Sequence, residues 1–262
     1  MVQIDLEELQ SILRSAGLLV TERGVAEVSN KSSLDYVTDI DLLVDHFLTE
    51  DLARFTPGIP VFSEERSMSR PQGAFWIIDP VDGTHNMIAG IPHYAVCAAL
   101  FTDTCAVAAA VLDIASGDLF VAQKGQGAFL NQNRLSMPTK PSTLVGVSSG
   151  MTDRLVRFPE CYKKLRQLGK IRNLGSQALH LCQVAIGRFG FTLSEEARFW
   201  DDAAGRLIAE EAGAVYRSFA ASNEDDLMRL AFSKAPLQSV CSHPDFAEDL
   251  EALLGNVWSR SS

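Results

Sequence analysis

The sequence predicts a mixed α/β fold (α+β mixed) in two halves, on three observations. Apolar residues recur at helical spacing at two places near the N-terminus. Short apolar runs separated by small turns then continue to residue 123, as they do in an antiparallel sheet. After the segment "MPTKP" (137–141) the pattern changes to alternating strands and helices, so we expect the halves to be residues 1–138 and 139–262.

The first half is expected to contain two helices followed by a sheet. The spacing of apolar residues predicts one helix from Ile4 to Leu19 and a second from Thr38 to Leu52, which the prolines and glycine of 57–60 end. Residues 31–38, between the helices, predict a loop or a short extended piece. Strands are expected at 61–63, at 74–79 and through an antiparallel meander over 93–123.

The second half is expected to begin with a strand and to continue mainly with helices. The strand is Leu144–Ser148, and Gly213 is placed to end one of the helices in the left-handed conformation. The expected helices are Asp153–Leu168, Ser176–Gly187, Asp201–Ala212 and Asp245–Leu254.

The composition limits the classes of partner. A hydrophobic content of 47% in 262 residues is ample for a large core in one or two domains. The net charge of -10 argues against a nucleic-acid polymer or an anionic membrane surface as partner. The longest apolar stretches, 94–101 and 105–112, are too short to span a bilayer.

The cysteines and the first residues predict a cellular location. The five cysteines are scattered and form no CxxC pair, as is typical of reduced thiols in a cytosolic protein. The chain starts with an acidic stretch that lacks a cationic segment, so we expect no signal peptide and a cytoplasmic protein.

The stretch "WIIDPVDGTHNM" (76–87) places two acids directly after a buried-looking strand. Asp79 and Asp82 are separated only by Pro80 and Val81, and a glycine and a threonine follow. A turn is one explanation, because Asp-Gly suits a hairpin. The other is a site for a divalent metal and a phosphate, since Mg²⁺ prefers oxygen ligands and glycine lets the backbone approach a phosphate.

Further acids occur in similar settings. Glu64 and Glu65 end another short strand, and Asp201 begins a helix. Each has a simple explanation: a solvated charge pair for the glutamates, and a favourable helix-dipole position for Asp201. Asp41 fits a capping box with Thr38. The joint occurrence of these acids favours a metal site.

Other metal and nucleotide motifs do not fit. The acidic run "DIDLLVD" lacks the glycine and the alternation of a calcium-binding loop, and there is no GxxxxGK[ST] phosphate loop. No HExxH or CxxC pair indicates zinc. The "DPVDGT" segment differs from the DxDGT of haloacid-dehalogenase-type phosphatases, because two residues separate its aspartates rather than one.

Five ordered blocks resemble the inositol monophosphatase family of Mg²⁺-dependent, lithium-sensitive phosphatases. The most specific are "WIIDPVDGTHNMIAGIPHYAV" and "WDDAAGRLIAEEAGA", and "VTDID", "SEE" and "GSQALHLCQVAIGR" fill the intervals in the family order. The resemblance covers about residues 1–255. It implies an αβαβα layered sandwich of the sugar-phosphatase type, a homodimer, and two to three Mg²⁺ ions per site.

The resemblance also implies roles for individual residues. Glu64, Asp79 and the Val81 carbonyl would hold a first Mg²⁺; Asp79, Asp82 and Asp201 would hold a second; and Asp41 would support a third ion or its waters. The Gly83 and Thr84 amides would hold the phosphate. The catalytic set would be Glu64, Thr84 and Asp41. The residues around these ligands would be Lys31, Asp35, Glu65 and Asn86.

Three positions depart from the family pattern near the substrate. His85 stands where the family often has Thr, and Gln177 where it often has Ala. Ser194 stands where close relatives have an inositol-contacting Glu, with Glu195 next to it. Arg198 is either exposed or within reach of a second phosphate or a carboxylate. The expected substrate-binding set is Gly83, Thr84, Gln177, Ser194 and Glu195.

The expected function is hydrolysis of inositol monophosphate or a related sugar or polyol phosphate, a small-molecule phosphate monoester, by metal-activated water. One alternative is a family relative that acts on a 3′-phosphoadenosine nucleotide, histidinol phosphate or fructose 1,6-bisphosphate. A second alternative, from another class, is an inactive metal-binding scaffold.

Overall fold

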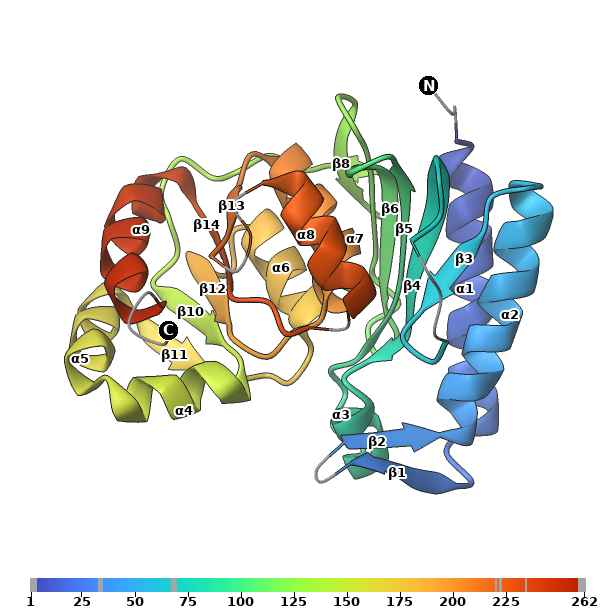
Figure 1. The fold of residues 1–262 in the computed structure, drawn as a ribbon, viewed down its shortest axis with the longest axis horizontal. Coiled ribbons are helices and arrows are strands. Elements are labelled where there is room, and N and C mark those ends of the chain that lie inside the picture. The colour runs from blue at the N-terminus through green and yellow to red at the C-terminus, as the bar shows by residue number, and fades with distance from the viewer. Residues whose placement is uncertain are drawn as a thin grey trace.

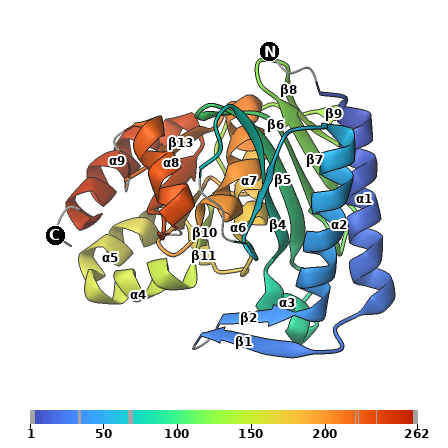
Figure 2. The same cartoon turned by 45° about the vertical axis from the view of Figure 1, so that its right-hand side comes forward.

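The computed structural model describes residues 4–32, 35–66, 70–219, 221, 223–233 and 235–258, which form five layers in the order αβαβα (Figure 1). Helices α1 (Leu6–Arg23) and α2 (Asp39–Phe55) cover the outer face of the larger sheet, and Figure 2 shows them side by side there. Helices α6 (Gln177–Ala185) and α7 (Phe199–Ala212) lie between the two sheets. The far face of the smaller sheet is covered by α4 (Ser149–Arg157), α5 (Pro159–Leu168) and α9 (Pro244–Trp258). The predicted fold class is confirmed.

The larger sheet has seven strands in sequence order, β3 to β9. Its first pair is parallel and the remaining pairs are antiparallel, which confirms the predicted meander. The strands are β3 (Val61–Ser63), β4 (Ala74–Asp82), β5 (Ala95–Thr102), β6 (Cys105–Asp113), β7 (Leu119–Gln123), β8 (Gly127–Leu130) and β9 (Asn133–Arg134).

Strand β4 continues three residues beyond the predicted end and contains a bulge. Asp79 is opposite Cys97 and Asp82 is opposite Ala95, so Pro80 and Val81 together face the single residue between those partners. A bulge accommodates Pro80, which has no N–H to donate to a ladder. It also bends the strand between the two aspartates, where the motif places its acids.

The smaller sheet has five strands in the order β11-β10-β12-β14-β13. Strand β10 (Leu144–Val147) confirms the predicted first strand of the second half. It pairs in parallel with β11 (Lys170–Arg172) and β12 (Phe191–Ser194), and the pairs made by β14 (Ser239–Ser242) with β12 and β13 (Val215–Ser218) are antiparallel. The sequence patterns did not predict β11, β12, β13 and β14.

One local prediction is confirmed in its second form and one is corrected. Residues 31–32 and 35–38, predicted as a loop or a short extended piece, are extended and belong to two paired antiparallel strands, β1 (Val28–Ser32) and β2 (Asp35–Thr38). The single helix predicted at 153–168 was wrong: α4 ends at Arg157 and α5 begins at Pro159. Phe158 between them has φ −123° and ψ 70°, because the residue before a proline is disfavoured in the helical region.

Two short helices complete the described part of the chain. Helix α3 (Thr84–Ala89) follows β4 directly and lies beside the β1–β2 hairpin (Figure 2). Helix α8 (Glu224–Ser233) lies next to α7 (Figure 1). No described helix is both long and apolar enough to cross a membrane.

One hydrophobic cluster joins the two sheets through the middle helical layer. It contains Phe75 and Phe120 of the larger sheet, Leu179 and Trp200 of the middle helices, and Cys241 of the smaller sheet, all buried. All five cysteines are free, as expected for reduced thiols. The two predicted halves therefore share a core, and their boundary at residue 138 stays a prediction.

Candidate metal and phosphate site

Three carboxylates from three separate elements converge near the end of β4. Glu64 follows β3, Asp79 lies in β4, and Asp201 lies in the first turn of α7. One oxygen from each group lies within 4.8 Å of those of the other two. Oxygen atoms at this spacing suit a divalent cation such as Mg²⁺, which takes carboxylates as ligands.

Asp79 is buried because the apolar run before it forms the centre of a covered sheet. Its side chain is 1% exposed, and the N–H of Val81 donates to its Oδ1 at 3.1 Å. Burial raises the pKa of Asp79 well above its ordinary value, and the Glu64 and Asp201 carboxylates raise it further. A cation bound among these groups would offset both effects.

Asp201 is the third residue of α7, and its side chain satisfies the backbone N–H of the residue that precedes the helix. Its Oδ2 accepts a hydrogen bond from the backbone N–H of Arg198 at 2.7 Å. Removal from water raises the pKa of Asp201 well above its ordinary value, and the Asp82 and Glu64 carboxylates add to that rise. The helix position predicted for Asp201 is confirmed, and the fold brings it to the acids of the larger sheet.

Asp82 is held by the start of α6. Its Oδ2 accepts from the Ser176 hydroxyl at 2.6 Å and from the Ala178 N–H at 2.7 Å, and its Oδ1 accepts from the Gln177 N–H at 3.2 Å. Burial raises the pKa of Asp82 to about 6, although these three hydrogen bonds lower it. The three donors fix the direction of the carboxylate in the absence of any cation.

Asp41 caps the start of α2 and also contacts Thr84, the first residue of α3. It forms the predicted capping box with Thr38, whose N–H donates to Asp41 Oδ2 at 2.8 Å. The other oxygen, Oδ1, lies 3.0 Å from the hydroxyl of Thr84, and that hydroxyl is also 3.0 Å from the Val81 carbonyl. Asp41, Thr84 and Val81 are therefore neighbours, and the roles that the family resemblance implies for them stay predictions.

The turn at Gly83 needs glycine and is fixed by Asn86. Gly83 has φ 97°, and a Cβ there would lie 3.1 Å from the His93 carbonyl oxygen and 3.2 Å from that of Gly175. The Asn86 amide donates to the carbonyls of His93 and Leu174, both at 2.7 Å. Because helix α3 starts at Thr84, its first N–H groups have no acceptor within the helix.

An ion pair anchors the Glu64–Glu65 turn. The Nε of Arg66 lies 2.6 Å from Oδ2 of Asp45, a buried residue of α2, and the N–H of Glu65 donates to Ser63 Oγ at 3.2 Å. Neither Arg66 nor Asp45 was predicted. The only signal for Asp45 is its position on the apolar face of a helix, which by itself indicates no partner.

The predicted substrate contacts are largely engaged within the protein. Glu195 forms an ion pair with Arg154 and accepts from the Trp258 indole at 2.7 Å, and its expected contact with substrate stays a prediction. Ser194 is 1% exposed, and its hydroxyl accepts from the Ala197 N–H at 3.2 Å. Gln177 is buried and its side-chain amide donates to Asp202, which revises its expected role.

Four other predicted positions have simpler outcomes. His85 is exposed and packs edge-on against Tyr36 of β2, with ring centroids 4.9 Å apart. Arg198 is the residue before α7, and its backbone N–H donates a hydrogen bond to Asp201 Oδ2. The side chains of Lys31 and Asp35 lie outside the described residues, so their expected roles near the site stay predictions.

These features define a class of protein: a five-layered α/β fold in which one buried and two half-buried acids, at strand and helix ends, form a candidate metal site. Residues 6–252 match the inositol monophosphatase family. The chain therefore belongs to this family, as the sequence motifs predicted.

Relatives with curated names cover most of the chain. The inositol-1-monophosphatase of Rhizobium meliloti is 34% identical over 216 residues, which are 78% of this chain and 81% of that protein. The Nus factor SuhB of Pseudomonas aeruginosa is 35% identical over 231 residues, 80% of this chain and 84% of that one. The family indicates a phosphatase, and its members carry more than one functional name.

Solved structures show the same fold. The IMPase of Thermotoga maritima superposes with a TM-score of 0.83 at 24% identity, over 97% of this chain and 98% of that one. An IMPase/NADP phosphatase complexed with Mg²⁺ and phosphate superposes with a TM-score of 0.74 at 21% identity, over 95% of this chain and 91% of that one.

Proposed function

We propose that this protein is a Mg²⁺-dependent phosphomonoesterase that hydrolyses inositol monophosphate or a related sugar or polyol phosphate. The observation that carries the proposal is the convergence of Glu64, Asp79 and Asp201 within 4.8 Å. Family membership and the Mg²⁺ and phosphate of the IMPase/NADP phosphatase structure support it.

The residues present fit magnesium. The ligands would be Glu64, Asp79, the Val81 carbonyl, Asp82 and Asp201, with Asp41 supporting a third ion. All of these are oxygen donors, and burial together with the neighbouring carboxylates raises the pKa values of Asp79 and Asp201 well above their ordinary value, which a bound divalent cation would offset. Bound Mg²⁺ would supply charge neutralisation on the phosphate and would activate water for attack.

The protein's own groups would bind and orient the reactants. The N–H groups of Gly83 and Thr84, at the start of α3, would donate to phosphate oxygens. Glu64 and the Thr84 hydroxyl would orient the attacking water in line with the ester oxygen, and Asp41 Oδ1, 3.0 Å from that hydroxyl, would hold it in place. The water oxygen forms a bond to phosphorus, the ester P–O bond breaks, and the alcohol leaves with a proton.

The preference for inositol monophosphate over other sugar or polyol phosphates is expected to be weak. A polyol is recognised by hydrogen bonds to a few fixed polar groups. At the position where close relatives have a free glutamate, this chain has the buried Ser194, and Glu195 is held by Arg154 and Trp258. The phosphate half of the site is complete, whereas the alcohol half lacks this carboxylate.

Phosphate release from a panel of monoesters, with Mg²⁺ and with chelator, tests the proposal. Release that requires Mg²⁺ is expected, and turnover that is equal in chelator would overturn it. A protein that binds Mg²⁺ but turns over no ester would instead support the scaffold alternative. Relatives named Nus factor SuhB keep that alternative open, while the filled set of carboxylate positions favours the enzyme.

Three further properties follow from the family resemblance and are proposed with the function. We propose inhibition by Li⁺ and by excess Ca²⁺, since Ca²⁺ prefers longer bonds and more ligands than Mg²⁺. We also propose a homodimer, for which sedimentation of the purified protein is the test. The test of the Ca²⁺ inhibition is activity at about a tenfold excess of Ca²⁺ over Mg²⁺. Unchanged activity would count against the oxygen-ligand site.

A further inference from the structure

A buried contact joins the first turns of α6 and α7 beside the acid cluster. The Gln177 Nε2 donates to Oδ1 of Asp202 at 2.7 Å, and the two residues are 9% and 1% exposed. The Gln177 backbone N–H donates to Asp82, and Asp202 directly follows Asp201. The contact therefore connects the turn that holds one acid to the turn that carries another.

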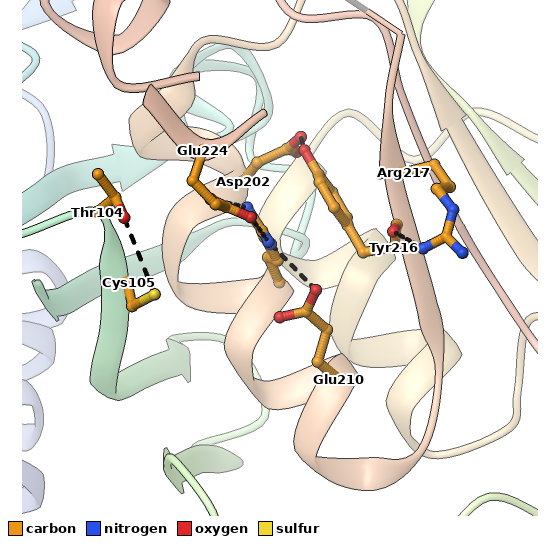
Figure 3. A network of polar contacts seen from close by, with 8 residues as sticks. Thr104, Cys105, Asp202, Glu210, Tyr216, Arg217 and Glu224 are labelled. Carbon is orange, nitrogen blue, oxygen red and sulfur yellow. Dashed lines mark hydrogen bonds and ion pairs between the residues drawn. The ribbon is translucent and has the colours of Figure 1, made fainter. Parts of the chain in front are cut away.

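Asp202 is fixed on its other side by the smaller sheet. The Tyr216 phenol of β13 donates to Asp202 Oδ2 at 2.6 Å, and Figure 3 shows this phenol reaching from the strand to α7. The Arg206 guanidinium lies 4.8 Å from the centre of the Tyr216 ring and is paired with Glu224 at 2.7 Å. Both oxygens of Asp202 are thus engaged, so its carboxylate gives Gln177 a rigid acceptor.

Helices α6 and α7 pack closely against each other, so a change in the Gln177–Asp202 contact would shift one helix relative to the other. A Cβ at Gly205 of α7 would lie 2.8 Å from the Leu181 Cβ and 3.1 Å from the Ala178 carbonyl oxygen of α6. Within the described residues, the Gln177 Oε1 is buried and has no hydrogen-bond partner. Its amide group is therefore oriented by the single bond to Asp202.

We propose that Gln177 is a positioning residue for the acid cluster, because its bond to Asp202 fixes the separation between Asp82 and Asp201. The inference rests on the proposed function, in which these acids bind Mg²⁺. Residues behind metal ligands orient them, and losing such a residue typically weakens metal affinity by about 10- to 100-fold. Gln177 would act through Asp82 and Asp202, which its backbone N–H and side-chain amide contact, and would not itself be a metal ligand.

Mg²⁺ binding to the purified protein, measured by calorimetry alongside Tm, tests this role. Gln177→Met keeps the size of the side chain and removes the donor, and about 10-fold weaker Mg²⁺ binding is expected. The matched control is Gln183→Met, on the same helix, whose half-buried side chain lies away from Asp202. We expect the control to bind Mg²⁺ within twofold of the wild type, a limit of about 0.4 kcal/mol.

A double variant that exchanges the donor and the acceptor of the Gln177–Asp202 bond distinguishes an effect on Mg²⁺ binding from an effect on stability. Gln177→Glu alone places two carboxylates together, so we expect it to weaken Mg²⁺ binding by at least about 10-fold. Gln177→Glu combined with Asp202→Asn restores the bond with donor and acceptor exchanged, and we expect binding to recover to within about threefold of wild type. If Gln177→Met does not fold, this pair decides: recovery supports the role, and a folded pair without recovery overturns it.

The outcomes distinguish this inference from the proposed function. Wild-type Mg²⁺ affinity in Gln177→Met, even with a lower Tm, would show a purely structural role and overturn the inference alone. A wild-type protein that binds no Mg²⁺ would overturn the proposed function and the inference together.

Discussion

Asp79 combines burial with close negative neighbours, two conditions that both oppose its ionised form. It is 1% exposed, and its pKa is raised first by burial and then by Glu64 and Asp201. A protein retains such a group where something else offsets the cost. A divalent cation shared with Glu64 and Asp201 would do so, and it gives Asp79 its proposed role as the bridging ligand.

The first prediction concerns Asp79→Asn. Removing the bridging charge should disperse the metal site and lower kcat by at least ~10³-fold, the scale of removing a main electrostatic element. The measurement is Mg²⁺-dependent phosphate release, with circular dichroism to verify the fold. Asp153→Asn, on the exposed surface of α4, is the control. Turnover near wild type in a folded Asp79→Asn protein would show that Asp79 does not bridge.

The second prediction concerns the Thr84 hydroxyl, which lies 3.0 Å from Asp41 Oδ1 and from the Val81 carbonyl. Thr84→Ala should lower kcat by about 10²-fold and leave KM within a few-fold, because orientation of water matters mainly in the transition state. Thr49→Ala, whose hydroxyl bonds only to its own helix, is the control. An effect on KM alone would reassign Thr84 to substrate binding.

Sequence motifs located the acids but not the groups that orient them. Asp79, Asp82 and Asp201 could be predicted because each sits in a local pattern, an apolar strand end or a helix start, that folding preserves. Gln177 was expected to face substrate, and the structure directs its amide to Asp202. The direction of a buried polar side chain depends on partners far away in the sequence, and no local pattern encodes it.

At the scale of elements, a clamp of three residues connects the C-terminal helix to the segment before α7. Arg154 of α4 pairs with Glu195 and donates to the Val257 carbonyl at 3.1 Å, and Trp258 of α9 donates to Glu195 at 2.7 Å. Arg154 is 8% exposed, so its charge is largely desolvated. The clamp fixes the segment that leads from β12 to Asp201.

The third prediction is that Arg154→Met destabilises the protein, because it leaves Glu195 without its cation. Breaking a buried pair costs about 3 kcal/mol or more, which corresponds to a fall in Tm of about 6–12 °C. The control is Lys163→Met, which removes the exposed pair with Glu160 and should change Tm by about 1–3 °C at most. Equal effects of the two substitutions in thermal melts would contradict this account of the clamp.

Element prediction succeeded where patterns were long. The helices at both ends of the chain and the meander of the larger sheet follow from apolar spacing over many residues. The break at Phe158 was missed because the apolar spacing continues across Pro159, which can begin a helix as readily as it interrupts one. The strands β11 to β14 were not distinguished from the segments around them in the sequence, and tertiary pairing determines them.

At the scale of the whole molecule, the acid cluster makes stability depend on pH and metal. The pKa of Asp82 is about 6 in the metal-free fold and 3.8 in the unfolded chain. Between these two pH values Asp82 is therefore protonated in the fold and ionised in the unfolded chain. The stability contributed by Asp82 is present below pH 3.8 and is lost as the pH rises through about 6. Buried His180 acts oppositely, because its pKa is lowered from 6.5 to about 3 and its contribution is lost as the pH falls.

The fourth prediction compares the Tm measured with Mg²⁺ and the Tm measured without it at the same pH. The contribution of His180 is the same in both and therefore cancels. The rise in Tm that Mg²⁺ causes should increase between pH 4 and 7, since bound Mg²⁺ requires the carboxylates without their protons. Each displaced proton strengthens Mg²⁺ binding by up to about tenfold per pH unit. Melts with Mg²⁺ and with chelator across this range are the measurement. A Mg²⁺-induced rise that is constant with pH would show that protons and metal do not compete.

The last prediction concerns substrate choice, which depends on both halves of the molecule. Residues 1–138 contain most of the groups proposed to bind phosphate, whereas residues 139–262 contain Ser194 and Glu195, whose polar groups are engaged within the protein. Losing one hydrogen-bonding partner for a hydroxyl weakens discrimination strongly. We therefore expect myo-inositol 1-phosphate to be hydrolysed without a large advantage over other monoesters. The measurement is kcat/KM for it and for glycerol 2-phosphate, fructose 1,6-bisphosphate, histidinol phosphate and adenosine 3′,5′-bisphosphate. A preference for inositol 1-phosphate of a hundredfold, about 2.7 kcal/mol, would mean that other groups replace the missing glutamate.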